Sequence, residues 1–172
     1  MKKFLLIFLI FNISVKAQTY TSYFTGDTAD VNPPTLGGVC LMGGAVENEN
    51  GMNWFLQRAN GGDVLVIRAT GSNGYNDYMY NDFGIEINSV ETIVINSIEA
   101  ANDPYVAQQI AAAEALWIAG GDQYDYVSKW KNTPVQTAIN ALINEKNAVV
   151  GGTSAGMAIL GSAYFSAGNG TI

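Results

Sequence analysis

The chain has 172 residues, of which 48% are hydrophobic and 13% charged, with a formal net charge of −7 and no histidine. This length allows one domain with a sizeable core, and the composition excludes disordered and fibrous proteins. An acidic chain without a basic stripe is not expected to bind nucleic acid, and the lack of histidine removes histidine metal sites and the usual general base of hydrolases.

The first residues have the pattern of a signal peptide. Lys2 and Lys3 form a positive n-region, residues 4–13 are an apolar h-region, and residues 15–17 have small side chains at the −3 and −1 positions of a cleavage site. The apolar run is too short to predict a membrane span, and nothing after it reaches spanning length. We therefore expect residues 1–17 to be removed. The mature protein, with a charge of about −10, is expected to be secreted or periplasmic and not attached to a membrane.

Residues 18–35 are polar and irregular, so we expect an entry loop before a domain that spans residues 36–172. In that domain, short apolar runs alternate with segments of helical spacing. The apolar runs are predicted to be strands buried on both faces. The expected strands are 38–42, 63–69, 91–96, 115–119 and 148–150, and the expected helices are 49–60, 104–114, 134–146 and 155–160, with weak helical spacing over 75–83.

This alternation predicts an α/β fold, with a mostly parallel sheet that is covered by helices on both faces. In such sheets, ligands bind beyond the carboxyl ends of the strands. Glycine-rich turns follow four of the expected strands, and we expect these turns to converge on one site. They begin at Gly43, Gly71, Gly120 and Gly151.

The last of these turns contains the sequence G-T-S-A-G at residues 152–156, which matches the G-x-S-x-G nucleophile elbow between a strand and a helix. Such a sharp turn strains the backbone of its serine and requires small neighbours. Ser154 is therefore the candidate nucleophile, and the amide of Ala155, at the start of the helix, is a candidate oxyanion donor. A turn in which Ser154 only caps the helix is the alternative.

The sequence G-G-D-Q at residues 120–123 closes the preceding strand. Its two glycines allow the backbone to approach a ligand, and their amides are candidates for the second oxyanion donor. Gln123 has the amide group needed to bind a substrate amide or carboxylate. The alternative is an ordinary turn at the end of a strand, in which Asp122 caps the next helix.

Together, the strand–GGDQ–helix and strand–GGTSAGMAIL–helix segments resemble the cyanophycinase branch of the S51 serine peptidases, over roughly residues 38–172. The resemblance implies the class I glutamine-amidotransferase-like fold, with Ser154 where the amidotransferases carry cysteine. It also implies an oxyanion hole formed by the amides of Ala155, Gly121 and Asp122, and substrate contact by Gln123. A peptide or cyanophycin-like substrate is expected, without metal or cofactor, and a homodimer is left open.

In this family, the catalytic histidine and its acidic partner lie downstream of the serine, whereas this chain reaches only Ile172 and has no histidine. We therefore expect the chain to be truncated at its C-terminus and inactive as given, because a serine without a base is a poor nucleophile. The intact protein is predicted to be a secreted serine peptidase that cleaves peptide or isopeptide bonds through an acyl-enzyme on Ser154. A non-catalytic exported peptide-binding domain, or the remnant of an enzyme, is the alternative.

Overall fold

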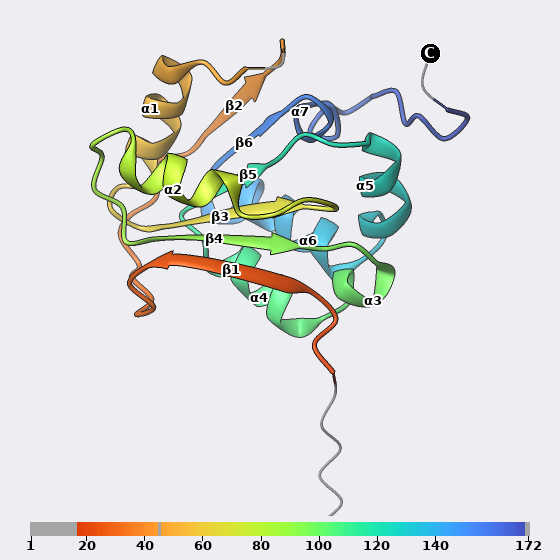
Figure 1. The fold of residues 1–172 in the computed structure, drawn as a ribbon, viewed down its shortest axis with the longest axis horizontal. Coiled ribbons are helices and arrows are strands. Elements are labelled where there is room, and N and C mark those ends of the chain that lie inside the picture. The colour runs from red at the N-terminus through yellow and green to blue at the C-terminus, as the bar shows by residue number, and fades with distance from the viewer. Residues whose placement is uncertain (1–16, 45, 171–172) are drawn as a thin grey trace, which may run out of the picture.

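The computed structural model describes residues 17–44 and 46–170 (Figure 1), so the predicted signal peptide lies outside the described residues except for Ala17. One sheet has the strand order β1-β4-β3-β5-β6-β2, and every neighbouring pair is parallel except β1 and β4. The predicted α/β class with a mostly parallel sheet is confirmed. The strands are β1 (Thr21–Gly26), β2 (Gly38–Met42), β3 (Asp63–Arg68), β4 (Ser89–Val94), β5 (Ala115–Ile118) and β6 (Val149–Thr153).

Helices cover both faces of the sheet (Figure 1). No helix of the described part is long and apolar enough to cross a membrane. The helices are α1 (Glu49–Arg58), α2 (Gly74–Asn81), α3 (Ile98–Ala101), α4 (Pro104–Ala112), α5 (Gln123–Trp130), α6 (Pro134–Ala141) and α7 (Ala155–Ala158), and a turn of π-helix, η1 (Leu142–Lys146), follows α6.

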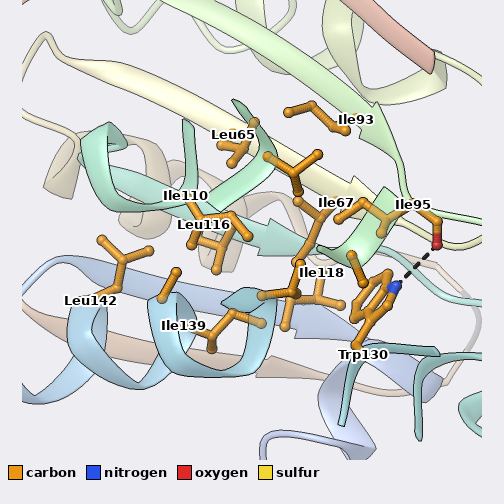
Figure 2. Packing of buried hydrophobic residues seen from close by; sticks show 14 of the residues in the cluster. Leu65, Ile67, Ile93, Ile95, Ile110, Leu116, Ile118, Trp130, Ile139 and Leu142 are labelled. Atoms are coloured by element: carbon orange, nitrogen blue, oxygen red, sulfur yellow. Dashed lines mark hydrogen bonds between the residues drawn. The ribbon is translucent and has the colours of Figure 1, made fainter. Parts of the chain in front are cut away.

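The two faces of the sheet have separate cores. On one face, α1 and α2 bury Phe55 and Met79, and the ring of Phe55 meets Trp117 of β5 edge to face, with 5.1 Å between the ring centroids. On the other face, α3 to α7 cover a larger apolar cluster (Figure 2). There the indole N–H of Trp130 donates to the carbonyl of Ile95 at 3.0 Å, so α5 is held against the carboxyl end of β4.

The predicted entry loop over residues 18–35 is wrong for its first part, because Thr21–Gly26 form strand β1. This strand pairs antiparallel with β4 along its whole length, so the sheet begins before the expected domain boundary at residue 36. Threonine, tyrosine and phenylalanine favour strands, and an edge strand tolerates polar side chains. The polar residues of this segment suggested a loop, and they concealed the strand preference of its threonine, tyrosine and phenylalanine residues.

Two other elements differ from the prediction. Strand β6 continues through two glycines to Thr153 instead of stopping at residue 150, and it therefore leads directly into Ser154. The helix expected over 134–146 is α helix only as far as Ala141 and ends as a π-helical turn, after which Asn147 adopts a left-handed conformation with φ 55°. The longer β6 matters for the candidate site because Thr153, the residue before Ser154, is held in the sheet.

Glu91 of β4 is a carboxylate buried between β1 and α4. It is 4% exposed, and it accepts hydrogen bonds from the hydroxyls of Ser22 and of Tyr105, the latter at 2.9 Å. Burial raises the pKa of Glu91 above its usual range, although these two hydrogen bonds act in the opposite direction. Folding therefore makes this carboxyl group harder to ionise than it is in the unfolded chain.

We expect Glu91→Gln to stabilise the protein at pH 7 relative to the native chain, with an advantage that shrinks as the pH falls towards about 4, near the pKa of a glutamate in an unfolded chain. A raised folded pKa adds stability that is fully present below the unfolded pKa and is lost as the pH rises through the folded value. Glutamine does not titrate, so the variant lacks this pH dependence. Urea denaturation of both proteins from pH 4 to 8 measures the difference in their free energies of unfolding. The control is Glu86→Gln at an exposed site, and a Glu91→Gln advantage that grows towards low pH would contradict the prediction.

Candidate active site

Ser154 lies between β6 and α7 in a backbone conformation that non-glycine residues rarely adopt, with φ 51° and ψ −116°. Its amide donates to the carbonyl of Met42 at 3.0 Å, which ties the turn to the end of β2, and its carbonyl accepts from the amide of Ala158 at 2.9 Å. The side chain is exposed above the carboxyl edge of the sheet. The strand, sharp turn and helix that the sequence predicted are therefore present around Ser154.

The glycines on either side of Ser154 let α7 pack directly on the backbone of the sheet. A Cβ atom on Gly152 would lie 2.7 Å from the carbonyl carbon of Gly156. A Cβ atom on Gly156 would lie 2.1 Å from the carbonyl oxygen of Ile118 in β5. Both distances are far below van der Waals contact, so the small residues of the motif are required by the packing of the turn.

The turn after β5 lies beside Ser154, as the convergence argument predicted. A Cβ atom on Gly120 would stand 3.5 Å from the Cβ atom of Ser154. Asp122 is the N-cap of α5, and its side chain accepts a hydrogen bond from the amide of Tyr124 at 2.8 Å, as in the capping alternative that the sequence left open. Gln123, the first residue of α5, is partly exposed.

The other two glycine-rich turns lie at different distances from the serine. The turn at Gly43 adjoins α7, since a Cβ atom there would be 3.9 Å from the sulfur of Met157. The turn at Gly71 follows β3, which is separated from β6 by β5. All four turns are at the carboxyl edge, but Ser154 is flanked directly by those that follow β2 and β5.

Tyr126 of α5 supports the turn beside Ser154, and sequence reasoning missed it. Its hydroxyl lies 2.7 Å from the carbonyl oxygen of Ala119 and 3.1 Å from that of Gly120. Burial raises the pKa of Tyr126 to about 12, so the hydroxyl stays a hydrogen-bond donor near neutral pH. The position of Tyr126 was not predictable because no local motif indicates which helix residue will reach back to the end of a strand.

The arrangement can carry out acyl transfer once a base is supplied. An exposed serine on a strained turn is positioned to attack a carbonyl, and backbone amides at the starts of α5 and α7 are candidates to receive the resulting oxyanion. The sequence has no histidine. Within residues 17–44 and 46–170, no three histidine, cysteine, aspartate or glutamate side chains are grouped to hold a metal ion.

A nucleophile elbow above the carboxyl edge of a mostly parallel sheet is the arrangement of α/β serine hydrolases. The model of the family described as peptidase family S51 matches residues 55–170. The chain therefore belongs to peptidase family S51, as the two glycine-rich motifs had suggested.

Curated relatives and a solved structure agree with this assignment. Cyanophycinases from Synechococcus elongatus and from Thermosynechococcus vestitus are each 26% identical to the chain over 138 residues, which is 76% of this chain and 43% of each relative. The crystal structure of a peptidase from an acI-B1 actinobacterium has the same fold, with a TM-score of 0.60 and 17% identity over 76% of this chain and 59% of that one. The chain thus spans less than half the length of the curated relatives.

Proposed function

We propose that the chain carries the nucleophile of a secreted or periplasmic serine peptidase, which cleaves peptide or isopeptide bonds through an acyl-enzyme on Ser154. The observation that carries this proposal is the backbone of Ser154, held at φ 51° with its side chain exposed beside Gly120. Such strain persists only where the surrounding structure fixes it, and it is concentrated at functional sites. The export of the protein is inferred from the leader pattern of residues 1–17.

In the proposed mechanism, the hydroxyl oxygen of Ser154 attacks the substrate carbonyl while a base takes its proton. The carbonyl oxygen becomes an oxyanion, which the amides of Ala155, Gly121 and Asp122 receive. The amine then leaves with that proton, and water hydrolyses the acyl-enzyme to restore the serine. Gln123, the first residue of α5, is assigned in this proposal to contact the substrate.

The relatives support a substrate class, because two of them are named as cyanophycinases. We propose a peptide or cyanophycin-like substrate and a reaction that needs no metal. Since these 172 residues include no histidine, we also propose that they are inactive by themselves. An exported peptide-binding domain without catalysis is the competing function, and it makes a different prediction for the chemistry of Ser154.

Added imidazole tests the proposal on the chain as it is. With p-nitrophenyl acetate and imidazole, we expect Ser154 to gain one acetyl group, because imidazole can take the proton that a histidine would otherwise remove. Without imidazole, acetylation is expected to stay at the level of Ser154→Ala. Intact-mass spectrometry followed by peptide mapping measures the extent and the site of acetylation.

The matched control is Ser128→Ala, which removes an exposed serine from α5 and should leave acetylation unchanged. If p-nitrophenyl acetate in the presence of imidazole acetylates Ser154 no faster than Ser128, the serine is not activated by its position. The peptide-binding alternative would then be favoured.

A further inference from the structure

A hollow of about 450 Å³ lies beside the carboxyl end of β3, between the loop that follows β2 and the start of α2. Its lining includes Arg68, the last residue of β3, and the side chains of Tyr75 and Tyr78 from α2. Glu47 and Glu49 contribute two carboxylates. Nothing in the mechanism proposed for Ser154 uses this hollow.

The guanidinium group of Arg68 is held in place by its own loop. Its Nε donates to the carbonyl of Thr70 at 2.5 Å, and its Nη1 donates to the carbonyl of Ser72 at 2.8 Å. Gly71, at φ 103°, leaves the room that this geometry needs, because a Cβ atom there would lie 2.3 Å from Nη2. A guanidinium has five N–H donors, so these bonds orient the group and leave donors for a ligand.

Arg68 forms no close ion pair among the residues that the structure describes. In the part of the chain that the structure describes, Lys129 pairs with Asp125 at 2.6 Å and Lys146 with Glu114 at 3.0 Å. Arg58 lies 4.1 Å above the ring of Trp54 at the other end of the sheet. Arg68 has neither kind of partner there, although a planar guanidinium is suited to bind a carboxylate through two hydrogen bonds.

Two polar side chains of the hollow, Tyr75 and Glu47, are bonded to each other. The hydroxyl of Tyr75 donates to Glu47, and burial together with this hydrogen bond raises the pKa of Tyr75 far above its usual value. This bond occupies one carboxylate oxygen of Glu47 and leaves its charge in the hollow. Glu47 therefore weakens the binding of an anion at Arg68, which provides a second way to test for one.

The register of the sheet places Arg68 within reach of a substrate at Ser154. Ile67 pairs with Ile118, and Ile118 pairs with Gly152, so Arg68 and Ser154 lie at neighbouring levels two strands apart. Strands are about 4.8 Å apart, so the two backbones are separated by about 10 Å. An extended peptide advances about 3.3 Å per residue, so a carboxylate within about three residues of the scissile bond can reach Arg68.

We propose that Arg68 is a specificity-determining residue that binds a carboxylate of the substrate in this hollow. The carboxylate is either the C-terminal group of a peptide or the side chain of an acidic residue. Calling the bound molecule a substrate rests on the proposed function. The binding of the carboxylate itself does not depend on Ser154.

NMR titration of the 172-residue chain tests the proposal with two matched pairs of probes. N-acetyl-alanyl-alanine and its C-terminal amide test the main-chain carboxylate, and the N-methylamides of N-acetyl-aspartate and N-acetyl-asparagine test the side chain. We expect at least one acid to bind about tenfold more tightly than its amide and to shift the backbone amides of residues 70–75. The pair that shows the preference identifies the source of the carboxylate.

Arg68→Gln is expected to remove the preference for the acid, and Arg58→Gln, the same change at the opposite edge, is expected to keep it. Glu47→Gln should tighten binding of the acid severalfold because it removes a repelling charge, and this variant leaves the Arg68 loop unchanged. Equal binding of acid and amide, shifts outside residues 70–75, or a preference that survives Arg68→Gln would each overturn the proposal. Ser154→Ala should bind the acid like the native chain, so carboxylate binding without acetylation of Ser154 would reject only the proposed function.

Discussion

Replacing Gly156 by alanine is expected to lower the free energy of unfolding by at least about 3 kcal/mol, the upper end of the usual cost of overpacking. The added Cβ atom would lie 2.1 Å from the carbonyl oxygen of Ile118 and 2.6 Å from that of Ala119. Both atoms belong to the backbone at the end of β5, a strand that is paired on both sides. Relief of the clash therefore requires α7 to move away from the sheet, and the turn at Ser154 moves with it.

Urea denaturation measures the loss of stability, and Gly74→Ala is the matched control. A Cβ atom on Gly74 meets nothing within 4 Å, and this residue begins α2 without a positive φ. The control is expected to be unchanged or more stable by about 0.4–1 kcal/mol, the usual gain from replacing a glycine at a compatible site. A Gly156→Ala protein as stable as the control would show that α7 does not pack on β5 as described.

Asn76→Ala is expected to cost about 2–4 kcal/mol, because it removes several buried hydrogen bonds at once. Asn76 is 1% exposed, and its amide nitrogen lies 3.1 Å from the carbonyl oxygens of both Tyr23 and Val90. Its amide oxygen accepts from the hydroxyl of Thr92 at 2.6 Å. This one side chain links α2 to β1 and β4, so its loss takes a hydrogen-bond partner from polar groups of both strands.

The thermal midpoint and the hydrogen exchange of β1 together test this role. In Asn76→Ala, the amides of β1 should exchange faster than those of β5, because β1 loses a contact with α2. Asn81→Ala is the control, since Asn81 is exposed at the end of the same helix. If both variants unfold at the same temperature, the buried amide does not join these elements.

The class of fold was predictable because the central strands are apolar on both faces. Strand β3 is buried from Val64 to Ile67, which produces the continuous apolar run that indicates a parallel strand between helices. Strand β1 was missed because only one neighbour pairs with it, and its polar residues remain partly exposed. Local composition separates such an edge strand poorly from a loop.

The candidate site was predictable where it consists of backbone and unpredictable where side chains reach across the fold. The elbow and the G-G-D-Q turn have a local signature, because glycine is required wherever chains approach closely. Tyr126 and Asn76 have none, since their partners are in other elements. Arg68 did leave a signal in the sequence, a single positive charge at the carboxyl end of an apolar strand.

The pairing of β2 with β6 has a consequence for how the chain acquires its structure. These neighbouring strands are roughly 110 residues apart in the sequence, and Ser154 also depends on Met42 at the end of β2 for its amide hydrogen bond. At about 5–20 residues per second, β2 waits on the order of 10 s during synthesis before its partner emerges. If the protein is exported as proposed, this delay keeps the sheet open while the chain is threaded through a translocon. The hydrogen bond from Ser154 to Met42 is therefore among the last contacts of the sheet that synthesis allows to form.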